Sequence, residues 1–155
     1  MIQRVQTLYL LLATALMSLT LFLPLATIWG GEHEMVVKAF FTDGVEGFKA
    51  PLPLYMGIVL AVATLLPFIT IFLFKRRLVQ IRLCVSEVVL LVGSLLFIAL
   101  YGYRMYDVLS QMFDSLNFTL GFASLMPLVS IIFVVLAMRA VARDEALVRS
   151  LDRIR

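Results

Sequence analysis

The chain has 155 residues, of which 63% are hydrophobic and only 15% are charged, and its formal net charge is +3. Ordinary soluble domains are about 45–50% apolar and about 25% charged, so this composition excludes a typical soluble domain. A disordered chain is excluded as well, because such chains are polar and highly charged. Length and composition together predict one small domain that spans a membrane several times.

Four apolar stretches are each long enough to cross a bilayer core of about 30 Å as a helix. They are residues 5–28, 54–74, 83–103 and 118–138. Backbone groups in lipid must be bonded within their own segment, and these runs lack the alternation of barrel strands. The sequence therefore predicts an all-α integral membrane fold, an antiparallel bundle of four transmembrane helices.

The two loops on the outer side of this bundle carry local patterns of their own. Residues 35–42 are β-prone and precede the turn dipeptide Asp43-Gly44 and residues 45–48, which predicts a small outer β-hairpin. Residues 104–117 place apolar side chains at 3–4 spacing on a polar ground. That spacing predicts a short amphipathic helix on the membrane surface.

The C-terminal segment, residues 139–155, contains no Pro or Gly, so we expect it to extend the fourth helix into the cytoplasm. Such a segment is either a solvated helix end, a helix on anionic lipid, or a stripe that docks on a partner. We favour contact with another protein or with the chain's own rim at residues 75–82, because charges of both signs flank the stripe. The candidate partner-binding residues are Asp144, Glu145, Leu147, Val148, Leu151 and Arg153.

Basic residues are concentrated on one side of the predicted membrane. With four spans, the N-terminus, the middle loop and the C-terminus share that side, which holds ten of the 13 Lys and Arg residues. They are Arg4, Lys75, Arg76, Arg77, Arg82, Arg139, Arg143, Arg149, Arg153 and Arg155. The positive-inside rule predicts that both termini are cytoplasmic. This rim also accounts for the net positive charge, so no nucleic-acid partner is expected.

Residue types that build catalytic or metal sites are scarce. His33 and Cys84 are the single histidine and cysteine, and they fall on opposite sides of the predicted membrane, so they cannot pair within one chain. His33 stands between two glutamates, but neighbouring side chains of an extended segment do not converge easily on a zinc ion. We therefore expect no enzymatic activity, no metal and no cofactor.

One ionisable residue lies inside a predicted span. Glu87 follows Leu83 by about 6 Å along a helix, so it can pair with a basic residue of the rim such as Arg4. A charge inside a membrane is also a functional hypothesis by default. We expect a hydrogen-bonded polar collar at the cytoplasmic ends of the helices that fixes their registry. Its candidate members are Arg4, Gln6, Gln80, Arg82 and Glu87.

Three segments carry a family resemblance that extends over the whole chain. They are residues 1–9 (MIQRVQTLY), 77–84 (RLVQIRLC) and 143–155 (RDEALVRSLDRIR). With these segments the chain resembles the small four-helix membrane proteins of Bacteroidota catalogued as domain of unknown function 4293. The resemblance implies a multi-pass protein of the inner membrane of a Gram-negative cell and no catalytic residues.

Two functional hypotheses follow. The first is a non-catalytic scaffold or accessory subunit that binds a membrane or cytoplasmic protein, or a second copy of itself, through its basic cytoplasmic face. The second is a small oligomeric transporter or channel that uses Glu87. A closed ion pair between Glu87 and Arg4 favours the first hypothesis, and a polar cavity that reaches past Glu87 towards Ser94 favours the second.

Overall fold

The computed structural model describes residues 2–31, 33–43, 53–74, 76–113 and 115–152. Side chains are described from residue 5 to residue 148 within these ranges. Of the predicted site residues, the side chains of Arg4 and Leu151, and the whole of Arg153, therefore lie outside the described part.

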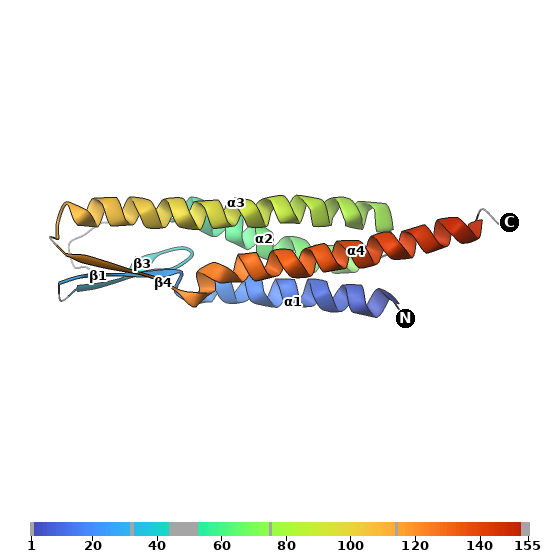
Figure 1. Ribbon diagram of the computed structural model, residues 1–155, viewed down its shortest axis with the longest axis horizontal. Coiled ribbons are helices and arrows are strands. Elements are labelled where there is room, and N and C mark those ends of the chain that lie inside the picture. The colour runs from blue at the N-terminus through green and yellow to red at the C-terminus, as the bar shows by residue number, and fades with distance from the viewer. Residues whose placement is uncertain (1, 32, 44–52, 75, 114, 153–155) are drawn as a thin grey trace.

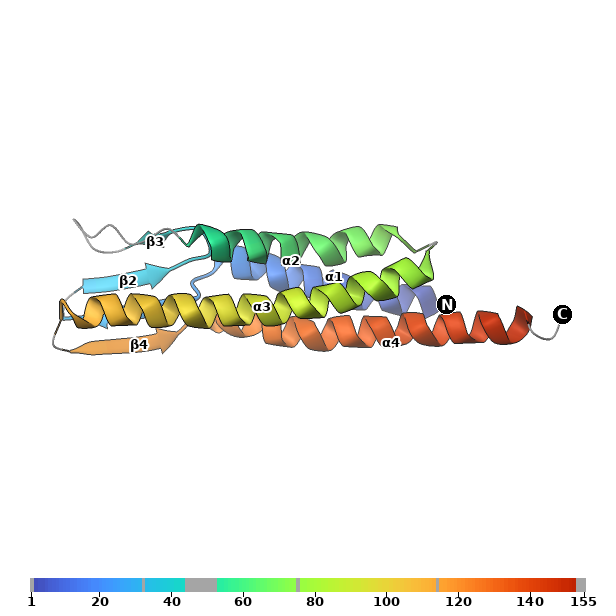
Figure 2. The same cartoon turned by 90° about the horizontal axis from the view of Figure 1, so that it is seen from above.

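Among the described residues, four helices are long and apolar enough to cross a membrane. They are α1 (Ile2–Phe22), α2 (Leu54–Phe72), α3 (Arg77–Ser110) and α4 (Met126–Asp152). The helices lie side by side, and each runs antiparallel to the two helices that it contacts most (Figures 1 and 2). Packing connects α1 to α2, α2 to α3, α3 to α4, and α4 back to α1, so the four helices form a closed ring.

The apolar residues of the helices face two ways. Between 28% and 33% of the residues in the four most apolar windows are buried among the helices. The inward-facing residues include Leu10, Ala13, Leu60, Leu91 and Val134, which form one core. Many large apolar side chains point outward, among them Leu8, Leu11, Ile58, Leu65, Val89, Leu96 and Ile132. An outer apolar surface of this extent fits contact with lipid tails and is unusual for a surface that faces water.

The helices differ in length, and the two longer ones extend beyond the others at opposite ends. The 21 residues of α1 and the 19 of α2 rise about 28–32 Å, which matches a bilayer core. The 34 residues of α3 rise about 51 Å, and its C-terminal part extends along the sheet (Figures 1 and 2). The 27 residues of α4 extend past the other helices at the end where both termini lie (Figure 1).

A small antiparallel sheet covers the end of the helices away from the termini. In the described residues its strands are β1 (Ala26–Gly30), β2 (His33–Val37), β3 (Thr42–Asp43) and β4 (Leu116–Leu120), in the order β3-β2-β1-β4. Gly31 has a φ of 61°, which suits the tight turn between β1 and β2. β1 also pairs with β4, so the sheet joins two segments that are far apart in the sequence.

The first and fourth predicted spans are wrong at their outer ends. α1 stops at Phe22, and residues 26–28, which we assigned to the first span, belong to β1. Pro24 explains the difference, because the residue before a proline avoids helical geometry and the β-branched Thr27 and Ile28 favour a strand. Residues 118–120, which we assigned to the fourth span, lie in β4, and α4 starts at Met126 after the short 3₁₀ helix Phe122–Leu125.

The two outer loops also differ from their predictions. Residues 35–42 are not a single strand, because β2 ends at Val37 and pairs with β3 across a turn at residues 38–41. The rest of the predicted hairpin, residues 44–48, lies outside the described residues. A further tight turn at Gly31 joins β1 to β2. The surface helix predicted at 104–117 is wrong, because α3 continues without a break to Ser110. The apolar side chains in this segment pack against the sheet instead of a membrane surface: Met105 and Leu109 are buried against Ile28 and Met35.

Candidate functional site

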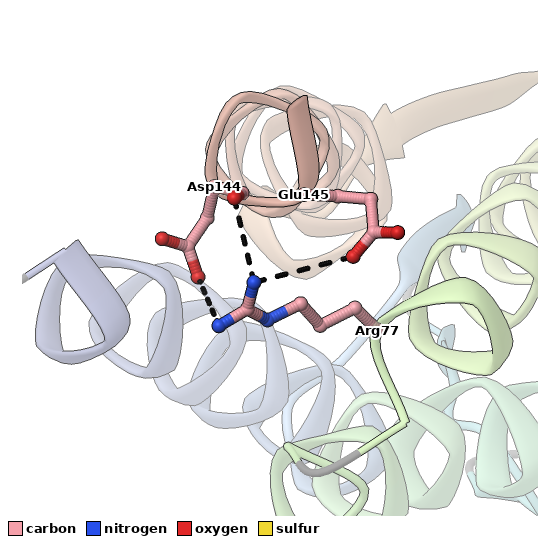
Figure 3. A network of polar contacts seen from close by, with 3 residues as sticks. All are labelled: Arg77, Asp144 and Glu145. Carbon is pink, nitrogen blue, oxygen red and sulfur yellow. Dashed lines mark hydrogen bonds and ion pairs between the residues drawn. The ribbon is translucent and has the colours of Figure 1, made fainter. Parts of the chain in front are cut away.

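Most of the described residues that the sequence analysis singled out lie at the end of the bundle where α1 begins and α4 ends, here called the basic end. One arginine joins two helices there (Figure 3). Arg77, the first residue of α3, places Nη2 3.2 Å from Oδ2 of Asp144 and Nη1 4.0 Å from Oε2 of Glu145. Its Nη1 also donates to the main-chain carbonyl of Asp144 at 3.4 Å. All three side chains are at most 25% exposed, so the contact is better shielded than a typical surface ion pair.

This contact, here called the Arg77 brace, holds the C-terminal part of α4 against the start of α3. α4 continues as helix to Asp152, so the predicted helical extension is observed as far as that residue. The extension thus contacts the chain's own 75–82 rim, one of the two contacts expected from the sequence. Arg149, the expected helical partner of Glu145, has a side chain outside the described part.

Beside the brace an open groove of about 630 Å³ separates the start of α3 from the α4 extension. Its walls are largely apolar, and the exposed Leu78 and Val148 lie on its two sides. Arg76 and Arg77 add positive charge, and Arg77 is already bound by the acids of α4. This extension groove is lined by Phe74, Arg76, Arg77, Leu78, Val79, Glu145 and Val148.

Three members of the predicted collar are buried between the helices. Gln6 is 6% exposed, Gln80 is 1% exposed and Glu87 is fully buried. Gln80 donates through Nε2 to the carbonyl of Thr70 at 3.2 Å, which joins α3 to the end of α2. Arg82 is exposed on the outer side of α3, so the structure does not bring it together with the buried members. The collar is therefore split, and the side chain of Arg4 is outside the described part.

Glu87 is the most unusual of these residues. Neither carboxylate oxygen has a hydrogen-bond partner among the described residues, although the side chain is fully buried. Burying an ionised carboxylate without a partner is costly, so such groups are uncommon away from functional sites. The predicted pair with Arg4 stays a prediction, because the side chain of Arg4 lies outside the described part.

Glu87 also lies deeper than its distance from Leu83 suggested. The contact between Gln80 and Thr70 sets the register of α3 against the antiparallel α2. Since both helices rise equally per residue, Glu87 is about level with Ala63, the middle residue of α2. From the start of α3 at Arg77, Glu87 is about 15 Å along the axis, half the thickness of a bilayer core.

Several polar groups between the helices were not singled out from the sequence. Thr70 accepts the Gln80 bond through its carbonyl, which no side-chain pattern reveals. Ser130 of α4 is fully buried, and its Oγ has no hydrogen-bond partner among the described residues. The Arg77 brace links positions 67 residues apart, so only the fold brings them together.

Long apolar helices, an outward apolar surface and a small sheet at one end define this chain as a helical protein with the architecture of a membrane protein. The family model described as "Domain of unknown function (DUF4293)" matches residues 2–154, so the chain belongs to this family. No curated protein matches the sequence.

Proposed function

We propose that the chain is a multi-pass protein of a bacterial inner membrane, an antiparallel bundle of four transmembrane helices with both termini in the cytoplasm. The distribution of charge supports this orientation, because ten of the 13 Lys and Arg residues stand at sequence positions 4, 75–82 and 139–155. The matched lengths of α1 and α2 support a perpendicular arrangement across the bilayer.

Within that membrane the chain acts as a non-catalytic scaffold or accessory subunit that binds a protein partner through its cytoplasmic face. The observation that carries this proposal is the Arg77 brace, which presents the α4 extension as an ordered helix beside an open groove. A solvated helix end needs no such brace. Holding the extension in place reduces the conformational entropy lost when a partner binds.

The extension groove defines the chemistry of that partner. Apolar walls and Arg76, for which no acidic partner is described, fit an amphipathic helix that has an apolar stripe with an acidic residue beside it. The partner is therefore a membrane or cytoplasmic protein with such a helix near the membrane surface. Asp144, Glu145 and Leu147 belong to the same part of α4, and Leu151 and Arg153 follow them in the sequence.

Affinity purification of the tagged full-length protein in a mild detergent, with quantitative mass spectrometry, tests this proposal. The double variant Leu78→Ser, Val148→Ser removes apolar contact area in the extension groove and should release a stoichiometric partner. A matched control is Leu120→Ser, Phe122→Ser, which removes exposed apolar area near the sheet. Equal retention of every copurifying protein by both doubles contradicts the proposal, and a partner that proves to be a second copy identifies a homo-oligomer.

One observation favours a second candidate, a small transporter or channel that uses Glu87. The carboxyl is buried, has no described partner and is about level with the middle of α2. Pro67 has no N–H group, so the carbonyl of Ala63 lacks its usual helical donor and offers an acceptor at about the level of Glu87. A carboxyl in such a place can hold and release a proton during transport.

Flux measurements in proteoliposomes separate the two candidates. A transporter should dissipate an imposed proton gradient, and Glu87→Gln should abolish this flux while the protein stays folded. The variant Ser94→Ala is a suitable control, because the Ser94 hydroxyl bonds only to the Leu91 carbonyl of its own helix among the described contacts. The absence of any flux above that of empty vesicles excludes the proton-coupled role.

A further inference from the structure

A second groove at the basic end lies between α1 and α4, on a different side of α4 from the brace. Its volume is about 370 Å³, and its walls come from both helices. They are Val5 and Tyr9 of α1, and Leu136, Arg139, Ala140, Arg143 and Leu147 of α4. Apart from Leu147, these residues are not used by the proposed docking of a protein partner.

The charge in this groove is unopposed. Arg139 and Arg143 are one helical turn apart on α4, and both are exposed. Neither arginine has an acidic partner among the described side chains. The nearest acids along the chain, Asp144 and Glu145, are both bound by Arg77.

The position of the groove relative to the membrane is set by α1. The apolar window of α1 begins at Val5, which lines the groove together with Arg139 and Ala140. Tyr9 and Leu136 lie about one turn deeper, or about 6 Å towards the bilayer centre. The arginines are therefore at the depth of lipid phosphates, and the apolar walls are at the depth of the glycerol and the first acyl carbons.

We propose that this α1–α4 groove binds an anionic glycerophospholipid of the cytoplasmic leaflet. Arg139 and Arg143 bind the phosphate of the headgroup, and an acyl chain lies along Val5, Tyr9 and Leu136. Basic pockets between helices on the cytoplasmic side suit such headgroups, because the charge and the apolar walls match the two parts of the lipid. A soluble phosphate would leave the apolar walls exposed to water, so the lipid is the better fit.

This inference depends on the proposed membrane orientation but not on a protein partner. A bound lipid would fill the space between α1 and α4 where their side chains leave the groove. It would also make the stability of the protein depend on the lipid composition, because a ligand that binds the folded state stabilises it.

Native mass spectrometry of the purified full-length protein tests the site, with phosphatidylglycerol as the anionic lipid and phosphatidylcholine for comparison. The double variant Arg139→Gln, Arg143→Gln should weaken phosphatidylglycerol binding about 10- to 30-fold, given about a factor of three to five for each exposed ion pair with the phosphate. The matched control Arg76→Gln, Arg82→Gln removes the same charge from the same end, but these arginines do not line the groove and their charge is screened by salt, so binding should change less than about twofold. Phosphatidylcholine binding should be unchanged in both doubles.

Three results would overturn the proposal. Equal loss in both doubles would show general attraction to the basic end, and no loss in the first double would show that the groove is not the site. Displacement of the lipid by excess inorganic phosphate would identify a soluble anion as the ligand. If the double variant does not purify as a folded protein, Arg143→Gln alone gives the same test, because this exposed residue has no described partner to lose.

Discussion

The structure predicts that removing the carboxyl group of Glu87 stabilises the protein. The variant is Glu87→Met, which keeps a long flexible side chain and removes both carboxylate oxygens. Since neither oxygen has a described hydrogen-bond partner, nothing is lost that offsets the desolvation of the carboxyl group. A buried group without a partner costs about 1–3 kcal/mol, so Glu87→Met should raise the free energy of unfolding by about that amount.

A second substitution, on the same face of α3, should change the free energy of unfolding in the opposite direction. Gln80 is buried two turns before Glu87, and its Nε2 is bonded to the carbonyl of Thr70. Gln80→Met removes a satisfied donor between two helices and should lower the free energy of unfolding by about 1–2 kcal/mol. Gln80 and Glu87 are both buried and polar, but only Gln80 has a described hydrogen-bond partner. Opposite signs of the change in the free energy of unfolding would therefore isolate the effect of the missing partner.

Equilibrium unfolding in mixed micelles, followed by circular dichroism during titration with a denaturing detergent, measures both variants against the wild type. If Glu87→Met lowers the free energy of unfolding by more than about 1 kcal/mol, Glu87 has a stabilising partner and the reasoning is refuted. Arg4 is then the first residue to examine, and a double-mutant cycle with Arg4→Gln measures the coupling directly.

The remaining predictions concern the brace and the glycines. Arg77→Gln should cost about 1–2 kcal/mol locally and speed amide hydrogen exchange of residues 145–150 about 5- to 30-fold, whereas the exposed Arg82→Gln should leave exchange unchanged. Gly121→Ala should destabilise the protein by more than about 2 kcal/mol, because its Cβ would meet the main-chain carbonyl oxygens of Pro24 and Leu25. Gly93→Ala, where a Cβ meets nothing within 4 Å, should be neutral or stabilise by up to about 1 kcal/mol; melting curves that rank the two alanine variants in the opposite order would contradict the packing described.

Hydrophobicity was sufficient to predict the number of long helices but not where they end. Residues 26–28 and 118–120 are as apolar as a transmembrane helix, and a short apolar run does not distinguish a strand from a helix. The position of Pro24 was available in the sequence as a stop signal. The pairing of β1 with β4 was not available, because the sequence of one strand does not identify a partner strand that follows two intervening long helices.

The candidate site was predicted only in part, because the sequence does not show how the helices pack against one another. The absence of Pro and Gly predicted that the fourth helix continues beyond residue 139, and hydrophobicity placed Glu87 inside the third span. These signals did not give the direction of each side chain, so Arg82 was grouped with residues that face the core although it faces outward. The depth of Glu87 depended on where α3 begins, six residues before the predicted start of that span at Leu83.

The central claim is that the chain crosses an inner membrane with its basic end in the cytoplasm, and cysteine labelling in intact cells tests it most directly. The native Cys84 is buried, so the wild type serves as the unlabelled background. A cysteine at Asn117, which is exposed in β4, should react with a membrane-impermeant maleimide added from outside. A cysteine at the exposed Val148 should react only after the membrane is permeabilised. Labelling of Val148→Cys but not Asn117→Cys in intact cells would contradict the account.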